Sequence, residues 1–113
     1  MKTDKQVKFH DWLCSIHVEQ YRTGHTAIIL RNAEELNEED IKSPPDMEDI
    51  AVATINVPKA NLMPDEVIIK DYSENEGMFA ALILGNVVHM PHRYFKDQNN
   101  DWPICKLKVP VNL

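Results

Sequence analysis

Apolar and polar residues alternate through the first third of the chain, and this alternation predicts an antiparallel hairpin. In the first stretch every second side chain is apolar: Trp12, Cys14, Ile16 and Val18. The opposite face carries Asp11, Ser15, His17 and Glu19. A period of two is typical of a half-buried strand, with its polar face toward solvent. Gly24 lies where a hairpin turn needs it, so residues 26–30 are expected to return as the partner strand.

Residues 65–88 combine strand and helix signals. The β-branched run at residues 67–69 favours an extended, half-buried backbone. Ser73 and Glu76 then stand at the spacing of a capping box, in which each side chain bonds a free backbone N–H of the first turn. These signals predict a strand followed by a helix over approximately residues 74–84.

Glycine and proline residues mark the ends of the remaining elements. Gly85 can take the left-handed conformation that closes a helix, and a strand is expected over residues 87–95. Further extended runs occupy residues 50–57 and 102–109. The 113 residues have the size of one domain. We therefore predict a single α+β domain with about six mostly antiparallel strands and one central helix packed on the sheet.

The predicted helix has no polar face. Residues 78–84 are seven consecutive apolar residues, a pattern typical of a helix that is buried all round. One small sheet covers only one side of such a helix, so a second cover is needed. Self-association as a homodimer, through Met78, Ala81 and Leu82, and full burial beneath loops of the same chain are both consistent with the pattern.

The net charge of −6 is concentrated in one stretch of the chain. Residues 34–49 contain one basic residue, Lys42, and eight acidic ones: Glu34, Glu35, Glu38, Glu39, Asp40, Asp46, Glu48 and Asp49. With Pro44 and Pro45, this polar stretch is expected to be an acidic loop insertion between two strands. It is either a solvated loop without a partner or a recognition surface for a basic partner.

Two cysteines and the absence of an apolar run bear on the compartment. No segment approaches the ~18 apolar residues of a membrane span, and residues 1–8 lack the apolar centre of a signal peptide. We therefore expect a soluble intracellular protein without a membrane partner. Cys14 and Cys105 have no C-x-x-C spacing and are expected to be reduced, buried thiols.

Three segments carry a resemblance to a known family: residues 53–58, 62–78 and 103–107, within a similarity that spans roughly residues 12–107. The chain resembles a family of small uncharacterised α+β proteins that are encoded largely on bacteriophages, plasmids and conjugative elements of bacteria. The family has no established activity. The resemblance implies action in the cytoplasm of a bacterial host cell, and it implies that the acidic insertion is this protein's own elaboration, because family members have a short turn there.

Signatures of catalysis and cofactor binding do not occur in the sequence. His89 and His92 point to opposite faces of an extended chain, and Pro91 forbids a helix that would bring them together, so no metal site is expected. The chain has neither a nucleophile elbow nor a glycine-rich phosphate loop. A pI of about 5.2 argues against direct nucleic-acid binding. We expect no cofactor and no enzymatic activity.

These observations favour a non-enzymatic accessory protein of a phage or mobile element. It would bind a host or defence-system protein with a basic surface through the acidic insertion. One version of the hypothesis adds inhibition of that protein, as anti-CRISPR and anti-restriction proteins do, by carboxylates that imitate a phosphate track. A homo-oligomeric structural or small-ligand-binding module is the alternative, and a small enzyme is the third.

Overall fold

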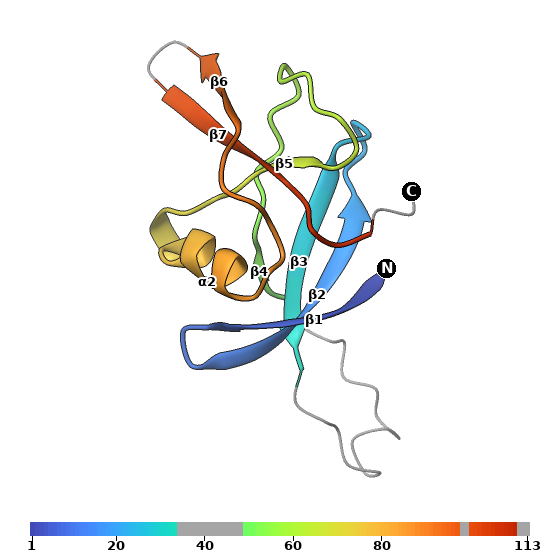
Figure 1. Cartoon of the computed structure of the whole chain (residues 1–113), viewed down its shortest axis with the longest axis vertical. Coiled ribbons are helices and arrows are strands. Elements are labelled where there is room, and N and C mark those ends of the chain that lie inside the picture. Colours follow the sequence, from blue (N-terminus) through green and yellow to red (C-terminus); the bar gives the residue numbers. More distant parts are fainter. Residues whose placement is uncertain (34–48, 98–99, 111–113) are drawn as a thin grey trace.

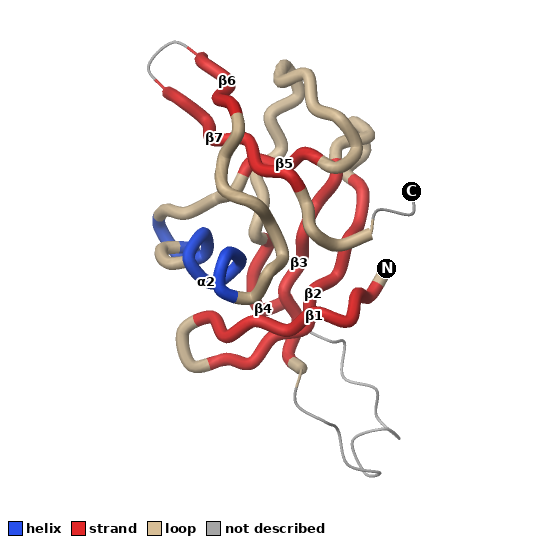
Figure 2. Tube along the Cα trace, in the orientation of Figure 1, coloured by secondary structure: helices blue, strands red, loops and turns tan. Residues whose placement is uncertain are grey.

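Two antiparallel sheets follow one another along the chain (Figures 1 and 2). The computed structural model describes residues 1–33, 49–97 and 100–110. The first sheet has the order β1-β2-β3-β4, formed by Lys2–Phe9, Trp12–Gln20, Thr26–Asn32 and Asp49–Val52. The second has the order β5-β7-β6, formed by Glu66–Ile68, Asn100–Lys106 and Arg93–Asp97. Between β5 and β6 lie a 3-10 turn, η1, and the helix α2: Ser73–Asn75 and Met78–Leu84.

The α+β class is confirmed, but the strands number seven in the described residues and divide into two sheets. The predicted pairing of β2 with β3 is also confirmed, with Ile16 opposite Leu30. The additional strand is β1, which lies at the edge of the first sheet. Most of its side chains are polar and only Val7 and Phe9 are buried, a composition that suits an edge strand but carries little periodic signal.

The segment after β4 joins the two sheets. The Ala53 N–H donates to the carbonyl of Ile28 in β3 at 2.8 Å, and the Ala53 carbonyl accepts from the Lys70 N–H at 2.8 Å. Ile55 N–H donates to the carbonyl of Ile68 at 3.0 Å. The extended run predicted over residues 50–57 therefore pairs with the first sheet at its start and with the second sheet further on.

One hydrophobic core fills the space between the sheets and the helix. Its members come from both sheets and from α2, and they include Ile16, Leu30, Val67, Met78, Leu82 and Cys105. A smaller cluster of Ala60, Ile68 and Ile104 lies under the loop between β4 and β5, with Phe95 and Trp102 packed against it. The buried side chains of α2 pack in the main core, and this packing fixes the orientation of the helix.

The helix begins at Met78, four residues later than the capping-box pattern predicts. Ser73 and Gly77 have φ angles of +59° and +94°, which are incompatible with a continuous right-handed helix. The predicted capping box does not form. Instead the carboxylate of Asp71 accepts a hydrogen bond from the Phe79 N–H at 2.8 Å and thus satisfies a free donor of the first turn.

The strands around the end of α2 also differ from the expectation. Val88 forms only an isolated bridge with Leu107, and β6 starts at Arg93, after Pro91. Proline cannot donate to a strand ladder, so the run predicted as one strand over residues 87–95 pairs regularly only at its end. The strand predicted over residues 102–109 is β7, which starts at Asn100 and ends at Lys106.

The side chains proposed for self-association lie inside the chain's own core. Met78 and Leu82 are fully buried and Ala81 is 9% exposed, so they offer no surface to a second copy of the described chain. Burial within one chain is thus what the structure shows for these three residues. The helix is not buried all round, however, because Leu84 is 83% exposed.

Gly85 is needed for close packing and not for a left-handed backbone. Its φ is −84°, and the neighbouring Asn86 takes the left-handed conformation at +57°. A Cβ atom on Gly85 would lie 2.3 Å from Cγ1 of Val7 in β1. The end of α2 therefore approaches β1 more closely than a larger residue would allow.

We predict that Gly85→Ala lowers the free energy of unfolding by about 1–3 kcal/mol, because the added methyl group overpacks the contact with β1. Urea denaturation would measure the loss. In a Val7→Ala background the same change should cost less, since the Cγ1 atom of Val7 is gone. Equal losses in both backgrounds would show that the contact with Val7 does not determine the effect.

Candidate functional site

The acidic insertion joins two neighbouring strands of the first sheet, β3 and β4. Seven of the eight residues predicted to bind a partner lie outside the described residues: Glu34, Glu35, Glu38, Glu39, Asp40, Asp46 and Glu48. The eighth, Asp49, is the first residue of β4. In the sheet order β4 is the outer strand and β3 is its neighbour, so the insertion connects the last two strands at one edge of this sheet.

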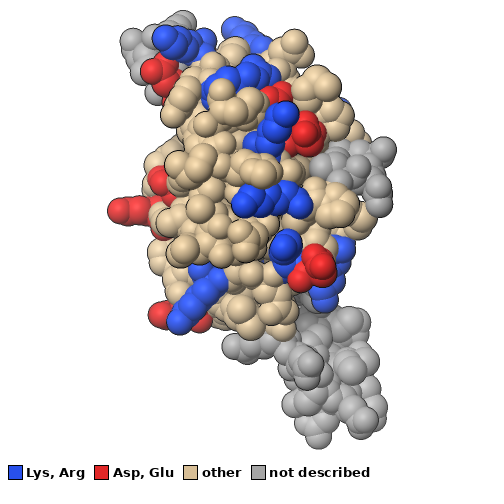
Figure 3. Space-filling model, in the orientation of Figure 1, with Lys and Arg blue, Asp and Glu red and all other residues tan. Residues whose placement is uncertain are grey.

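The described part of the chain is electrically balanced, with eleven basic and eleven acidic residues. Residues 34–48 hold the other seven acidic residues and one lysine, so this segment alone accounts for the net charge of −6. Figure 3 shows that basic side chains recur along one face of the described part. The negative charge is therefore concentrated in residues 34–48, and the described residues have no net charge.

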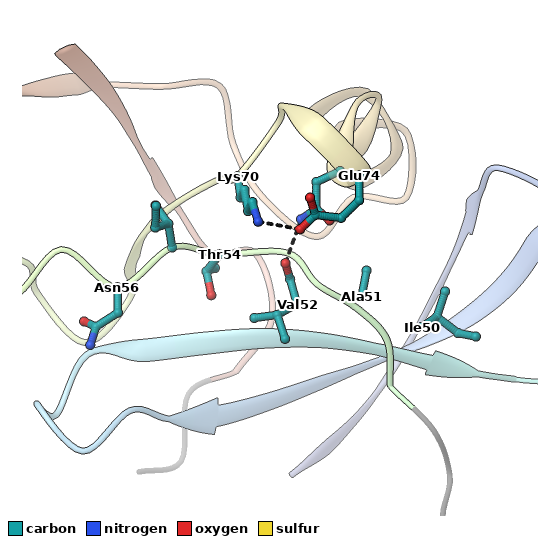
Figure 4. Close-up of a pocket in the computed structure, with 9 residues that line it drawn as sticks. Ile50, Ala51, Val52, Thr54, Asn56, Lys70 and Glu74 are labelled. Atoms are coloured by element: carbon teal, nitrogen blue, oxygen red, sulfur yellow. Dashed lines mark hydrogen bonds and ion pairs between the residues drawn. The ribbon is translucent and has the colours of Figure 1, made fainter. Parts of the chain in front are cut away.

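A groove of about 500 Å³ lies beside β4, immediately after the insertion (Figure 4). One wall is the chain of β4 and its continuation, and the other consists of residues near η1. The lining residues are Ile50, Ala51, Val52, Thr54, Ile55, Asn56, Lys70, Glu74 and Asn75. Both apolar and polar residues line this groove.

Two polar contacts define the wall opposite β4. The Lys70 ammonium pairs with the Glu74 carboxylate, which holds the pKa of Glu74 at about 2. The buried Asn75 side chain donates through Nδ2 to the Val52 carbonyl at 2.7 Å. The sequence contains no signal for either contact. Lys70 lies outside any helix, so its spacing of four residues from Glu74 does not predict a contact, and the second contact joins residues 23 positions apart.

Ser15, His17 and Arg31 meet on the face of the first sheet that was expected to be exposed. Ser15 is 3% and His17 is 4% exposed, because β2 lies between β1 and β3 and Arg31 of β3 covers it. Arg31 Nη1 lies 3.3 Å from His17 Nδ1, and Ser15 Oγ lies 3.0 Å from His17 Nε2. The prediction that both side chains face solvent is therefore wrong.

The hydrogen bonds of these three residues run in the wrong direction for Ser15 to act as a nucleophile. A guanidinium has only donors, so Nδ1 of His17 must accept and the ring proton is on Nε2, which donates to Ser15. The Ser15 hydroxyl in turn donates to the Arg31 carbonyl at 3.3 Å. Burial, and next Arg31, lower the pKa of His17 and favour this neutral form. His17 cannot take the hydroxyl proton, so the trio is structural.

A buried carboxylate, Glu66, ties the second sheet to the loop before it. Glu66 is 3% exposed and accepts from Arg93 Nε at 3.0 Å and Nη2 at 2.9 Å. The Met63 N–H and His92 Nε2 supply further bonds at 2.8 and 2.5 Å, and Arg93 also donates to the Asn61 carbonyl at 2.6 Å. The bond from Arg93 is the largest cause that lowers the pKa of Glu66 to about 2, against the opposing effect of burial.

His92 thus has a carboxylate partner, and the structure does not bring it together with His89 in any metal-binding group. The described residues contain no cluster of three or more histidine, cysteine, aspartate or glutamate side chains that could hold a metal ion. Cys14 and Cys105 are free and buried, as predicted. Burial raises the pKa of the Cys105 thiol to about 11, so this thiol is unreactive at neutral pH.

Comparison with protein-family models, with curated proteins and with solved structures found no match for this chain. Within the described ranges, no helix is long and apolar enough to cross a membrane.

We predict that the Glu66 cluster supports the fold above about pH 5 and that its contribution disappears as the pH falls toward 2. The ordinary pKa of the carboxyl is 4.5 and the folded value is about 2, so the ionised form favours folding. Glu66→Gln should lower the free energy of unfolding by about 2 kcal/mol at pH 7 and by much less at pH 2. Urea denaturation across this pH range would measure both effects.

The exposed carboxylate of Glu76 supplies the control for this measurement. Glu76→Gln should leave the acid limb of the stability profile unchanged. A loss at pH 7 that persists undiminished at pH 2 in Glu66→Gln would contradict the assignment, because it would arise from packing and not from the ionised carboxylate.

Proposed function

We propose that this chain is a non-enzymatic binding protein that uses its acidic segment, residues 34–49, to engage a basic surface of a partner protein. The observation that supports the proposal is the separation of charge: the described residues are balanced, and residues 34–48 carry the whole net charge of −6. Clustered carboxylates repel one another, and a basic partner relieves that repulsion while being steered toward the segment at long range.

The place of the segment in the fold supports a binding role. Both of its ends are attached to strands of one sheet, and β3, next to it, pairs with β2 along its whole length. The segment also leads directly into β4, whose residues line the groove of Figure 4. A partner held by the carboxylates would therefore lie next to this groove.

The family resemblance adds context to this proposal. A protein of a phage or mobile element acts in the cytoplasm of a bacterial host, and the partner is then a host or defence-system protein. Carboxylates spaced along a segment imitate the phosphates of a nucleic acid, so the basic surface they occupy would be one that normally binds DNA or RNA. Inhibition of the partner, in the manner of anti-CRISPR or anti-restriction proteins, follows from that competition.

A small-ligand-binding module is the second candidate function, and the groove of about 500 Å³ beside β4 favours it. That volume is within the range of small-molecule sites. A homo-oligomer formed through Met78, Ala81 and Leu82 has no such support, because these three side chains are buried within the chain.

We predict that changing Glu38, Glu39 and Asp40 together to Ala weakens partner binding by about tenfold or more, because three partly desolvated ion pairs are lost. The partner would first be identified by affinity capture from host cells. Binding would then be measured by biolayer interferometry at about 50 and about 300 mM salt, and the triple variant should show the weaker salt dependence.

A variant with the same change of charge on the scaffold provides the control: Asp4, Glu76 and Asp97 changed together to Ala. These three exposed carboxylates are spread over the described surface. If the scaffold variant loses as much affinity as the segment variant, or if the segment variant binds normally, the acidic segment is not the recognition surface.

A further inference from the structure

β5 and β7 separate at a position that proline determines. The last regular pair between these strands is Ile68 with Ile104. The next pair would place Ile69 opposite Pro103, and the chain instead bridges from Ile69 to Thr54 on its other side. The two strands diverge from this point onward.

The hydrogen-bond register explains the divergence. The Leu107 N–H donates to the Asp65 carbonyl at 2.8 Å, so in this antiparallel ladder every second pair counted from Asp65 exchanges backbone bonds. Ile69 and Pro103 occupy such a position. Proline has no N–H, and the ladder cannot continue through it. Residues 69–72 are therefore free to leave β7, which opens a space between the strands.

That space is a groove of about 470 Å³ with aromatic walls and acidic groups. Its lining residues are Ile69, Asp71, Tyr72, Asp101, Trp102 and Pro103. None of these six carries a positive charge, so the two carboxylates make the groove acidic. Tyr72 is 47% exposed and thus presents much of its ring to solvent.

This lining selects for a cation with a flat apolar body. An anionic ligand would be repelled by Asp71 and Asp101, and an uncharged apolar ligand would desolvate both carboxylates without compensation. A guanidinium stacks on aromatic rings and forms paired hydrogen bonds with carboxylates, which an ammonium cannot match. An arginine side chain therefore fits the aromatic walls and the acidic groups together.

One contact within the free chain is consistent with such a ligand. The Lys70 ammonium lies 5.5 Å from the centroid of the Tyr72 ring, so this ring already attracts a cation. Lys70 itself is paired with Glu74 and lines the other groove.

We propose that the groove between residues 69–72 and 101–103 is a docking site for an arginine-bearing segment of a partner protein. The site is built from residues outside the acidic segment, so it goes beyond the proposed function and is testable without the partner. This groove would recognise one arginine side chain by its shape and charge, whereas the acidic segment would bind through clustered charge alone.

The two tryptophan indole N–H signals of the chain make a direct test by NMR possible. Trp102 lines the groove, whereas Trp12 begins β2 next to the β1–β2 turn, away from the start of β7 (Figure 1). Titration with the peptide acetyl-Ala-Arg-Ala-amide should shift the Trp102 signal in a saturable manner and leave Trp12 unchanged. The matching peptide with Gln in place of Arg should produce no saturable shift.

Variants of the exposed aspartates test the role of charge. Asp101→Asn should weaken binding of the arginine peptide by about tenfold. Asp97→Asn, in the same β6–β7 ribbon but outside the groove lining, should bind as the unmodified chain does. Equal responses to the Arg and Gln peptides, or equal losses in the two aspartate variants, would overturn the proposal.

The Glu38, Glu39 and Asp40 triple variant separates this proposal from the proposed function. If the groove is the site, the triple variant binds the arginine peptide normally even where it has lost the partner. If the triple variant loses the peptide and Asp101→Asn keeps it, the acidic segment attracted the peptide and the groove proposal is wrong, while the proposed function stands.

Discussion

The backbone of Ala53 is the connection on which the rest of the structure depends. Its N–H donates to Ile28 in β3 and its carbonyl accepts from the N–H of Lys70, so one residue links the first sheet to the chain that follows β5. Its fully buried methyl group lies in the main core. Because Lys70 is held there, the chain after β5 is drawn toward the first sheet and away from β7. Both grooves, one beside β4 and one beside Pro103, lie along the segment that this connection positions.

Buried polar side chains such as Glu66 and His17 stabilise the fold, whereas the surplus acidic residues are concentrated in one stretch of the sequence. The carboxylate of Glu66 and the His17 ring each have several partners, as the cost of burying an unsatisfied polar group requires. The acidic residues of the segment between β3 and β4 are balanced by a single lysine along the chain. The proposed binding function uses the acidic residues between β3 and β4, whereas catalysis would need buried polar groups such as Glu66 and His17.

Local signals predicted part of the fold correctly. The alternation in β2 and the β-branched run at β5 both identified strands, because the period of two and side-chain branching act within a few residues. The same kind of signal failed at the start of α2, where Gly77 in a left-handed conformation separates the turn at Ser73 from the helix. The buried positions of Ser15 and His17 were also missed, since an Arg31 side chain from the next strand covers them.

Patterns within the sequence predicted the pairing of β2 with β3, the class of the fold and the position of the negative charge, because each depends on neighbours along the chain. The tertiary structure alone decided which side of α2 is buried, and it alone created the grooves. Their walls meet through residues distant in sequence, such as Val52 with Asn75 and Ile69 with the region of Pro103. Such meetings depend on how two sheets share one core, and no periodic pattern in the chain encodes that arrangement.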